Sequence, residues 1–439
     1  MLKVGLAKQC INPPLKSVMA GFAARNGVAQ SVHDDLYVRA LVIDNGHTSV
    51  FLLSLEVIAL SSDFVRNIRC ALQENTGIPP QNILCAATHT HCGPVTVKAF
   101  FNSDEDIDQA YGDFLKDQAI KTAAQAWHER SPAHIGIGST KVTELGVNRC
   151  SADGKPVDEE VGILEIVNEG EHIRGMLINY GCHPTVLGPN TLQITGDFPA
   201  FALNMIEQQC GKDCLALFLN GPQGNIGPGH SSAKSAIGII DPARTFSRAE
   251  AIGKILAHKV LEAIPEINLA NNPVLDGKIV VVQLPPKRYP PVKQIETQLH
   301  EVKSKLEKIK NNTVKLNEKL PANLEQLRLQ ILYKTIELYY AYESEHLSTI
   351  EVEIQAIRIG PCAFLALPAE VFTEIGMEIK KRSPLKTYVV ALANGYIGYL
   401  PNRQAYVTGG YECVSSGLAP EAADHIIERS LELLHSFSS

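Results

Sequence analysis

Long apolar runs that alternate with helical segments constrain the fold of this 439-residue chain more than any other feature. Residues 49–60 (SVFLLSLEVIAL) and 214–220 (CLALFLN) are continuous runs of the kind that form buried strands. Residues 108–129, between them, have helical spacing and strong helix formers. Buried strands that alternate with helices predict a layered α/β fold, in which helices flank a mixed β-sheet.

Shorter segments continue this alternation along the chain. Residues 37–44 (YVRALVID) alternate in polarity, and Asn45-Gly46 forms a turn before the run at 49–60. Pro199 opens a helix at a first-turn position, where proline is tolerated. We predict further strands at 83–88, 161–167, 173–180, 274–284, 350–359, 362–367 and 387–393, and helices at 62–76, 199–209, 247–263, 369–381 and 420–436.

A change of composition after residue 290 predicts an inserted helical hairpin. Pro321 separates two helical stretches, and we expect two long arms over residues 290–345 within a single domain that spans residues 1–439. The spacing fits a solvated arm packed along one seam, a contact between copies in a homo-oligomer, or a lid over an active site. The first stretch repeats apolar residues at steps of four and three: Ile295, Leu299, Val302, Leu306 and Ile309.

Composition argues against two classes of function. The 40 Lys and Arg residues against 47 Asp and Glu give a net charge of −7, which excludes nucleic-acid binding through bulk positive charge. No apolar run reaches the ~20 residues of a transmembrane helix. The first residues, MLKVGLAKQC, lack the apolar region of a secretion signal. We therefore expect a cytoplasmic protein whose ten cysteines are reduced thiols.

Two histidines directly after a predicted strand are the strongest chemical signal. The segment reads Ala-Thr-His89-Thr-His91-Cys92-Gly93-Pro94. Alternate residues of an extended segment point the same way, so His89 and His91 can face one cleft. This arrangement favours a metal or catalytic site. Cys92 beside them is a second candidate nucleophile, if a base lies within reach.

Two later segments place further ligand types at strand ends. His183 follows the apolar run MLINY in Gly-Cys-His-Pro-Thr. Glu370 lies at a strand-to-helix junction, and we place it in the first turn of the helix. Either the helix dipole or a metal explains that carboxylate, because Glu joins two His readily at zinc. Asp197 either prepares a helix start or orients a ligand histidine.

Two segments rich in glycine complete the candidate site. Residues 220–230 (NGPQGNIGPGH) follow a buried strand and lack the Gly-Lys-Ser/Thr of a P-loop. The backbone N–H groups of this loop could stabilise an oxyanion, or the loop could be a tight connection only. Tyrosines alternate with glycines in residues 393–401, and Tyr411 follows. A phenol can donate to an oxyanion or bind a metal.

In this order, the segments resemble the neutral/alkaline non-lysosomal ceramidase family over most of the chain, to about Glu412. The most specific piece is His-Thr-His-x-Gly-Pro, supported by Gly-x-His-Pro-Thr, Pro-x-Glu-x-x-Thr and Asn-x-Tyr-x-x-Tyr. The resemblance implies a Zn²⁺ ion, His91 as a residue that contacts the scissile amide or assists proton transfer, Arg149 as a ligand for a substrate oxygen, and Tyr411 as a further catalytic residue. The implied zinc ligands are His89, His183, Glu370 and Tyr399.

The chain departs from the family pattern at one reactive position. The family carries a serine in Gly-Asp-x-Ser-Pro, and Gly227 occupies that position here. Ser231 and Ser232 lie close in sequence, without evidence that they substitute. We also expect no counterpart of the C-terminal β-sandwich of extracellular members. The resemblance then implies a zinc-dependent hydrolase of an amide (N-acyl) bond that uses metal-activated water. Its substrate would be a small-molecule or lipid-like N-acyl compound, and the alternative is a catalytically inactive metal-containing binding protein.

Overall fold

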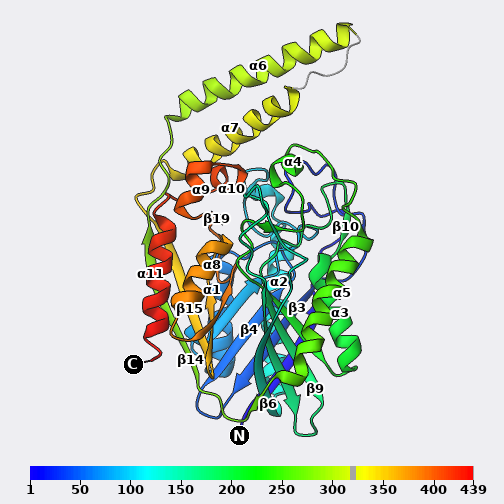
Figure 1. Cartoon of the computed structure of the whole chain (residues 1–439), viewed down its shortest axis with the longest axis vertical. Coiled ribbons are helices and arrows are strands. Elements are labelled where there is room, and N and C mark those ends of the chain that lie inside the picture. The colour runs from blue at the N-terminus through cyan, green and yellow to red at the C-terminus, as the bar shows by residue number, and fades with distance from the viewer. Residues whose placement is uncertain (317–322, 439) are drawn as a thin grey trace.

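A nine-stranded mixed β-sheet curls around the core of the protein, and a four-stranded sheet closes that core (Figure 1). The computed structural model describes residues 1–316 and 323–438. The long sheet has the order β11-β9-β8-β6-β1-β3-β4-β5, with β13 paired to β6. Its strands are β1 (Lys3–Cys10), β3 (Tyr37–Asp44), β4 (Ser49–Leu55), β5 (Ile83–Ala87), β6 (Ser131–Lys141), β8 (Glu160–Asn168), β9 (Ile173–Tyr180), β11 (Leu215–Asn220) and β13 (Leu269–Ala270).

The second sheet has the order β14-β15-β16-β18 and packs its inner face against the long sheet. Gly162 on β8 allows the closest approach, because a Cβ there would lie 2.4 Å from the ring of Tyr388 on β18. The Tyr388 hydroxyl donates to the carbonyl of Gly138 on β6, at 2.8 Å. The strands of this sheet are β14 (Leu275–Leu284), β15 (Ile350–Ile359), β16 (Cys362–Ala366) and β18 (Lys386–Val390).

Helices cover the outer faces of both sheets. Helices α1 (Ser62–Thr76) and α2 (Gln109–His128) lie on the β1–β3 side. Helix α3 (Asp197–Cys210) lies on β9 and β11, and α5 (Phe246–Ala263) packs on α3 and β6. Helices α8 (Thr373–Arg382) and α11 (Ala422–His435) cover the second sheet. The cap residues explain the limits of α1: the Ser61 side chain accepts from the N–H of Phe64, and Gly77 ends the helix at φ 74°.

Short elements connect these layers. Three two-stranded pairs form, β2 (Ser31–Val32) with β10 (Gln193–Ile194), β7 (Val147–Asn148) with β12 (Ile226–Gly227), and β17 (Glu370–Val371) with β19 (Tyr399–Leu400). The short helices are α4 (Ser232–Ala236), α9 (Arg403–Thr408) and α10 (Tyr411–Val414), with 3₁₀ turns at Pro80–Asn82, Asp104–Asp106 and Ile264–Glu266.

The curl of the long sheet brings its two ends together. Strand β11 ends one side of the sheet order and β5 the other, yet β11 lies against β4 and β5. Ser54 on β4 donates to the carbonyl of Phe218 on β11, at 2.6 Å, and the Asn220 amide donates to the carbonyl of Thr88, at 3.0 Å. The carboxyl ends of β5, β9 and β11 therefore meet at one end of the core.

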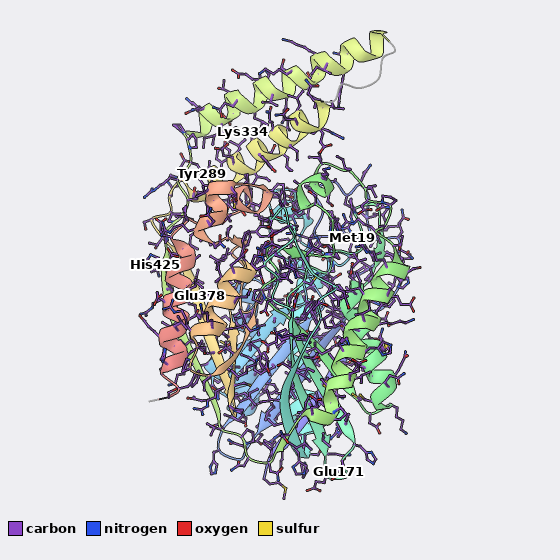
Figure 2. All side chains as sticks on the ribbon, in the orientation of Figure 1. Met19, Glu171, Tyr289, Lys334, Glu378 and His425 are labelled. Atoms are coloured by element: carbon purple, nitrogen blue, oxygen red, sulfur yellow. The ribbon has the colours of Figure 1, made fainter. Side chains whose placement is uncertain are left out.

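The hairpin projects from this same end of the molecule (Figure 1). Helices α6 (Val292–Leu316) and α7 (Leu324–Ser344) pack on each other, and Ile295 and Leu299 of α6 are buried. The predicted break at Pro321 lies outside the described residues. Helix α7 also contacts α10 and α4 of the body. Figure 2 shows Tyr289 near the base of the hairpin and Lys334 on α7.

The structure confirms the predicted mixed sheet, its flanking helices and the inserted hairpin. Two points differ. The predicted helix at 369–381 begins only at Thr373, because Glu370 and Val371 form strand β17. Strand β6 was not predicted, because Gly136 and Gly138 interrupt its apolar pattern; both face Ile267 closely. Within the described residues, no helix is long and apolar enough to cross a membrane. That residues 1–439 form a single domain stays a prediction.

Candidate functional site

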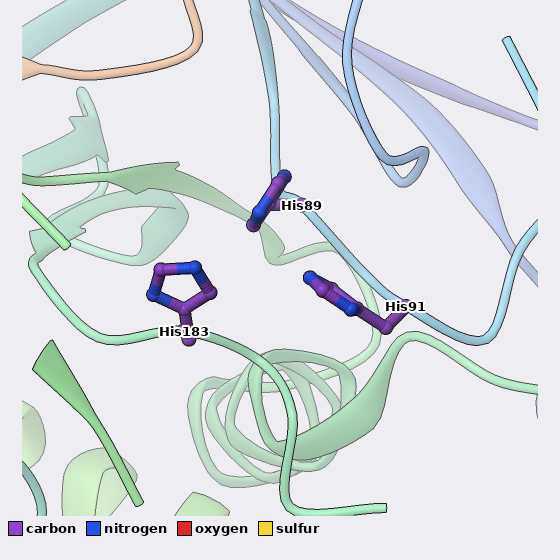
Figure 3. Close-up of side chains that lie close together, drawn as sticks. All are labelled: His89, His91 and His183. Carbon is purple, nitrogen blue, oxygen red and sulfur yellow. The ribbon is translucent and has the colours of Figure 1, made fainter. Parts of the chain in front are cut away.

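Three histidines converge where the strand ends meet (Figure 3). His89 and His91 follow β5, and His183 follows β9. One ring nitrogen from each lies within 4.8 Å of the others. The ring centroid of His89 lies 4.8 Å from that of His91 and 5.1 Å from that of His183. The structure thus brings together the predicted strand-end histidines from two distant parts of the chain.

Backbone carbonyls orient two of these rings. The Nδ1 of His89 lies 2.6 Å from the carbonyl oxygen of Ile58, and the Nδ1 of His183 lies 2.7 Å from that of Gln223. A carbonyl accepts only from an N–H, so each Nδ1 carries the proton and each Nε2 presents a lone pair. Burial lowers the pKa of His183 to about 4, so its ring is neutral at pH 7.

His89 adopts an uncommon backbone conformation, with φ 74°. A left-handed conformation is costly for a residue with a side chain, and such residues gather at functional sites. The N–H of His89 donates to the carbonyl of Val57, at 2.9 Å, which holds the segment against the end of β4. The surrounding strands therefore fix a strained residue at the centre of the cluster.

Glu370 joins the cluster from the second half of the chain. Its Oε2 lies 3.0 Å from His183 Nε2 and 3.4 Å from His89 Nε2, while Tyr396 donates to its Oε1 at 2.7 Å. The predicted position in a helix turn is wrong: Glu370 lies in β17, opposite Tyr399 of β19. This pairing, rather than a helix dipole, places the carboxylate.

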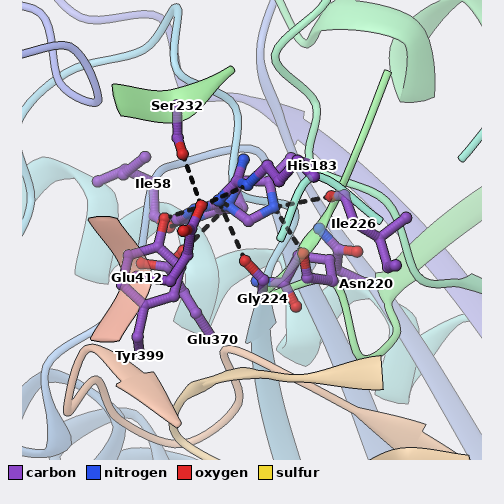
Figure 4. A network of polar contacts seen from close by, with 12 residues as sticks. Ile58, His183, Asn220, Gly224, Ile226, Ser232, Glu370, Tyr399 and Glu412 are labelled. Atoms are coloured by element: carbon purple, nitrogen blue, oxygen red, sulfur yellow. Dashed lines mark hydrogen bonds and ion pairs between the residues drawn. The ribbon is translucent and has the colours of Figure 1, made fainter. Parts of the chain in front are cut away.

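Arg149 links the two halves of the site through its contacts with Gly224, Tyr399 and Glu412, which Figure 4 labels. Its Nη2 donates to the Tyr399 hydroxyl and to the Gly224 carbonyl, each at 3.0 Å. Its Nε donates to Glu412 Oε1 at 2.8 Å, and Ser232 donates to the same oxygen at 2.6 Å. Burial disfavours the cation, but Tyr399 and Glu412 outweigh it and raise the pKa of Arg149. A buried, fully charged guanidinium thus lies beside the histidine cluster.

The two predicted tyrosines lie side by side next to Arg149. The rings of Tyr399 and Tyr411 are 6.2 Å apart and nearly perpendicular. Burial raises the pKa of both phenols, and Glu370 adds to the effect, strongly for Tyr399. A protonated phenol such as that of Tyr411 is a hydrogen-bond donor, which suits stabilisation of a negative oxygen. Of these two tyrosines, Tyr399 accepts a hydrogen bond from Arg149.

His91 has no hydrogen-bond partner at either ring nitrogen among the described residues, although both atoms are buried. Burial, together with His89 and His183, lowers its pKa well below the usual value. The ring lies 4.9 Å from that of Phe22 and rests against Gly21, where a Cβ would come within 2.4 Å. Gly21 has φ 93°, a left-handed backbone conformation that favours glycine, and its lack of a side chain also leaves room for the His91 ring. The neutral ring therefore has a lone pair on one nitrogen that no hydrogen bond from a described residue occupies.

The glycine-rich loop acts through its carbonyls. The carbonyls of Gln223 and Ile226 face His183 Nδ1, at 2.7 and 3.0 Å, and that of Gly224 accepts from Arg149. A Cβ on Gly224 would lie 2.4 Å from the Glu370 carbonyl oxygen, so only glycine fits. The N–H of Gly224 donates to the Val371 carbonyl. The predicted alternative of an oxyanion site built from its N–H groups has no support in these contacts.

Gly227 lies beside Arg149 with room for a side chain. A Cβ there would be 3.6 Å from Arg149 Cδ and Nη1, an ordinary van der Waals separation. Two other candidates have structural roles. The Asp197 carboxylate accepts from the backbone N–H groups of Val186, Leu187 and Phe198, and so does not orient a histidine. Burial raises the pKa of Cys92 to about 12, which keeps this thiol protonated and unreactive.

A cavity of about 230 Å³ opens onto the histidine cluster. His89, His91 and Glu370 line its floor. Its upper wall includes Tyr339, Tyr340 and Glu343 from α7, and Phe100 and Phe101 from the segment before the 3₁₀ turn at 104–106. The hairpin therefore contributes directly to the space in which a ligand of the cluster would lie.

Sequence reasoning missed the supporting roles of Tyr396 and Glu412. Tyr396 donates to Glu370, and Glu412 pairs with Arg149. Both lie within two segments already singled out for their tyrosines. The only signal in the sequence was that each is a polar residue within three positions of a predicted site tyrosine. Their partners, Glu370 and Arg149, can be identified only in the folded chain.

The comparisons with known proteins agree with this geometry. A family model described as "Neutral/alkaline non-lysosomal ceramidase, N-terminal" matches residues 2–234. A ceramidase complexed with C2 has 16% sequence identity and a TM-score of 0.75, over 100% of this chain and 75% of the other. The neutral ceramidase from Pseudomonas aeruginosa has 17% identity and a TM-score of 0.74, over 99% and 74%. At these identities the structural likeness establishes the fold.

Proposed function

This chain belongs to the neutral/alkaline non-lysosomal ceramidase family, and we propose that it is a zinc-dependent hydrolase of an amide (N-acyl) bond. One observation carries the proposal. Buried imidazole nitrogens and a buried carboxylate converge on one point, and His89 Nε2 has no hydrogen-bond partner there among the described residues. A buried polar atom without a partner costs free energy unless something binds it.

The donor set fits a zinc ion. Two imidazole nitrogens and one carboxylate oxygen are the ligands of many catalytic zinc sites. We propose that His89, His183 and Glu370 hold the ion, with Tyr399 as the fourth ligand. When bound, Zn²⁺ lowers the pKa of water and polarises a carbonyl group.

The remaining residues supply positioning and proton transfer. Arg149, held by Glu412, would stabilise the negative charge that develops on the carbonyl oxygen of the substrate, with Tyr411 near Tyr399 as a further donor. His91, neutral and unpaired, would take a proton at a ring nitrogen and return it to the leaving amine. Water is the nucleophile in this proposal, because Gly227 has no reactive group and the Ser232 hydroxyl is bound to Glu412.

The absence of a serine at Gly227 also supports the alternative, a metal-containing binding protein without catalysis. The retained Arg149–Glu412 pair and the free His91 ring favour the hydrolase. The substrate would be a small-molecule or lipid-like N-acyl compound.

The two functions differ in their response to His91→Gln. We expect this variant to keep its zinc and to lose at least about a hundredfold in kcat for an N-acyl substrate, because a general acid–base residue contributes about 10²–10⁴-fold. Hydrolysis of a panel of N-acyl compounds, measured beside zinc content, gives the comparison. A zinc-containing wild-type protein that hydrolyses no N-acyl compound would favour the binding protein.

A further inference from the structure

The cavity at the histidine cluster lies next to a larger groove. The groove takes about 600 Å³ and runs between the first turns of α1 and α2. Three residues line both spaces: Val97, Lys98 and Tyr396. Tyr396 is fixed from within by its hydrogen bond to Glu370. The boundary between the two spaces therefore consists of the fixed ring of Tyr396, the small apolar side chain of Val97 and the long flexible side chain of Lys98.

The groove has an apolar floor beneath a polar rim. The exposed side chains of Asp63 and Asp104 and the half-buried side chain of Lys116 belong to the rim. The floor suits a hydrocarbon chain, because each CH₂ group that leaves water adds to binding. The apolar residues that line the groove are Leu60, Phe64, Val95, Ile107, Tyr111 and Leu115.

Lys98 spans the gap from the body to the hairpin. Its Nζ lies 3.0 Å from Glu343 Oε1 on α7 and 3.8 Å from Asp104 Oδ2, and it lies 5.9 Å from the centre of the Tyr339 ring. The Lys98 and Glu343 side chains are 38% and 48% exposed, and such a surface pair contributes little to stability. The pair therefore matters here because it holds the lysine stem in the passage between cavity and groove.

We propose that Lys98, held by Glu343, limits the length of the acyl chain that the cavity accepts, an inference that rests on the proposed N-acyl hydrolase function. Lys98 lines both the cavity and the groove, so an acyl chain long enough to pass from one to the other meets the Lys98 stem. Without that stem, the end of the chain would continue over the apolar floor of the groove.

Binding of straight-chain carboxylic acids, the acyl products of such a hydrolase, tests this limit without turnover. Calorimetry would compare hexanoate with dodecanoate on the wild-type protein, on Lys98→Ala and on Lys116→Ala. Lys116 lines the groove but not the cavity, so it is the matched control for loss of a positive charge. We expect Lys98→Ala to raise the affinity for dodecanoate relative to hexanoate by at least about tenfold, since each buried CH₂ adds to binding. Lys116→Ala keeps the wild-type ratio.

The ratio of affinities decides the outcome, because removal of a charge affects both acids alike. An unchanged ratio in Lys98→Ala, or wild-type protein that already binds dodecanoate more tightly than hexanoate by about tenfold, would overturn the length limit. Glu343→Gln provides a second variant that leaves the lysine in place, and we expect a smaller shift of the same sign. A shifted ratio in a protein that hydrolyses no N-acyl compound would count against the proposed function and leave the length limit standing.

Discussion

The histidine centre and the cavity wall on the hairpin side each contain an ion pair, and the two pairs differ in their surroundings. Arg149 and Glu412 at the centre have side chains that are 6% and 5% exposed, against 38% and 48% for Lys98 and Glu343 at the wall. Removing one partner of a buried pair leaves an unpaired charge away from water, whereas a surface pair is screened. The same type of contact therefore fixes the reacting groups in one region and only positions a side chain in the other.

The largest predicted effect tests this contrast directly. Glu412→Gln leaves Arg149 buried beside a neutral partner, and we expect it to lower the free energy of unfolding by about 3–5 kcal/mol. Glu343→Gln at the wall should change it by at most about 1 kcal/mol. Urea unfolding of both variants measures the two changes in the free energy of unfolding. Equal losses would mean that the two pairs do not differ as their exposure indicates.

Asp197, buried beneath the centre, makes stability depend on pH. Burial, partly offset by three backbone N–H groups, raises its pKa to about 6, from 3.8 for an ordinary aspartate. A raised pKa in the folded state gives stability that is complete below pH 4 and is lost as the pH rises through 6. The loss is up to about 3 kcal/mol. We expect Asp197→Asn to flatten this part of the curve, measured by urea unfolding between pH 4 and 7.5. A variant with the wild-type slope would contradict the assignment.

The smallest expected effect on stability is at Gly227. A serine there meets only ordinary contacts with Arg149, so Gly227→Ser should change the free energy of unfolding by about 0.5 kcal/mol or less. The activity of Gly227→Ser shows whether the histidine centre or the cavity wall limits which substrates are hydrolysed. Gain of ceramide hydrolysis would show that the missing nucleophile limited the substrate range. Correct folding without such a gain would place the limit in the cavity wall.

Much of the centre was predictable, because its chemistry lies at the ends of strands. His89, His91 and His183 each follow an apolar run, and the curl of the sheet unites them. Glu370 was identified as a candidate ligand, but its position in a strand was not predicted. Strand β17 forms by pairing with β19, and the paired residues Glu370 and Tyr399 are 29 positions apart in the sequence. Local sequence favours a helix start at this position, and the distant partner decides otherwise.

The wall and the supporting contacts were much less predictable. The hairpin was expected from its spacing, yet nothing in that spacing showed that Tyr339, Tyr340 and Glu343 would line the cavity. Tyr396 and Glu412 lay inside recognised segments, but their partners come from other parts of the chain. Periodicity predicts which elements form, whereas side-chain partners between distant elements depend on the packing of the whole molecule.

The metal content of the purified protein tests the central claim most directly. Elemental analysis of the wild-type protein beside His183→Ala is the measurement. The proposed site predicts about one zinc ion per chain, lost in the variant, because His183 supplies one of few ligands and removal of one leaves too small a set. Wild-type protein that holds no metal even after zinc is supplied would contradict the zinc site and the hydrolysis proposed from it.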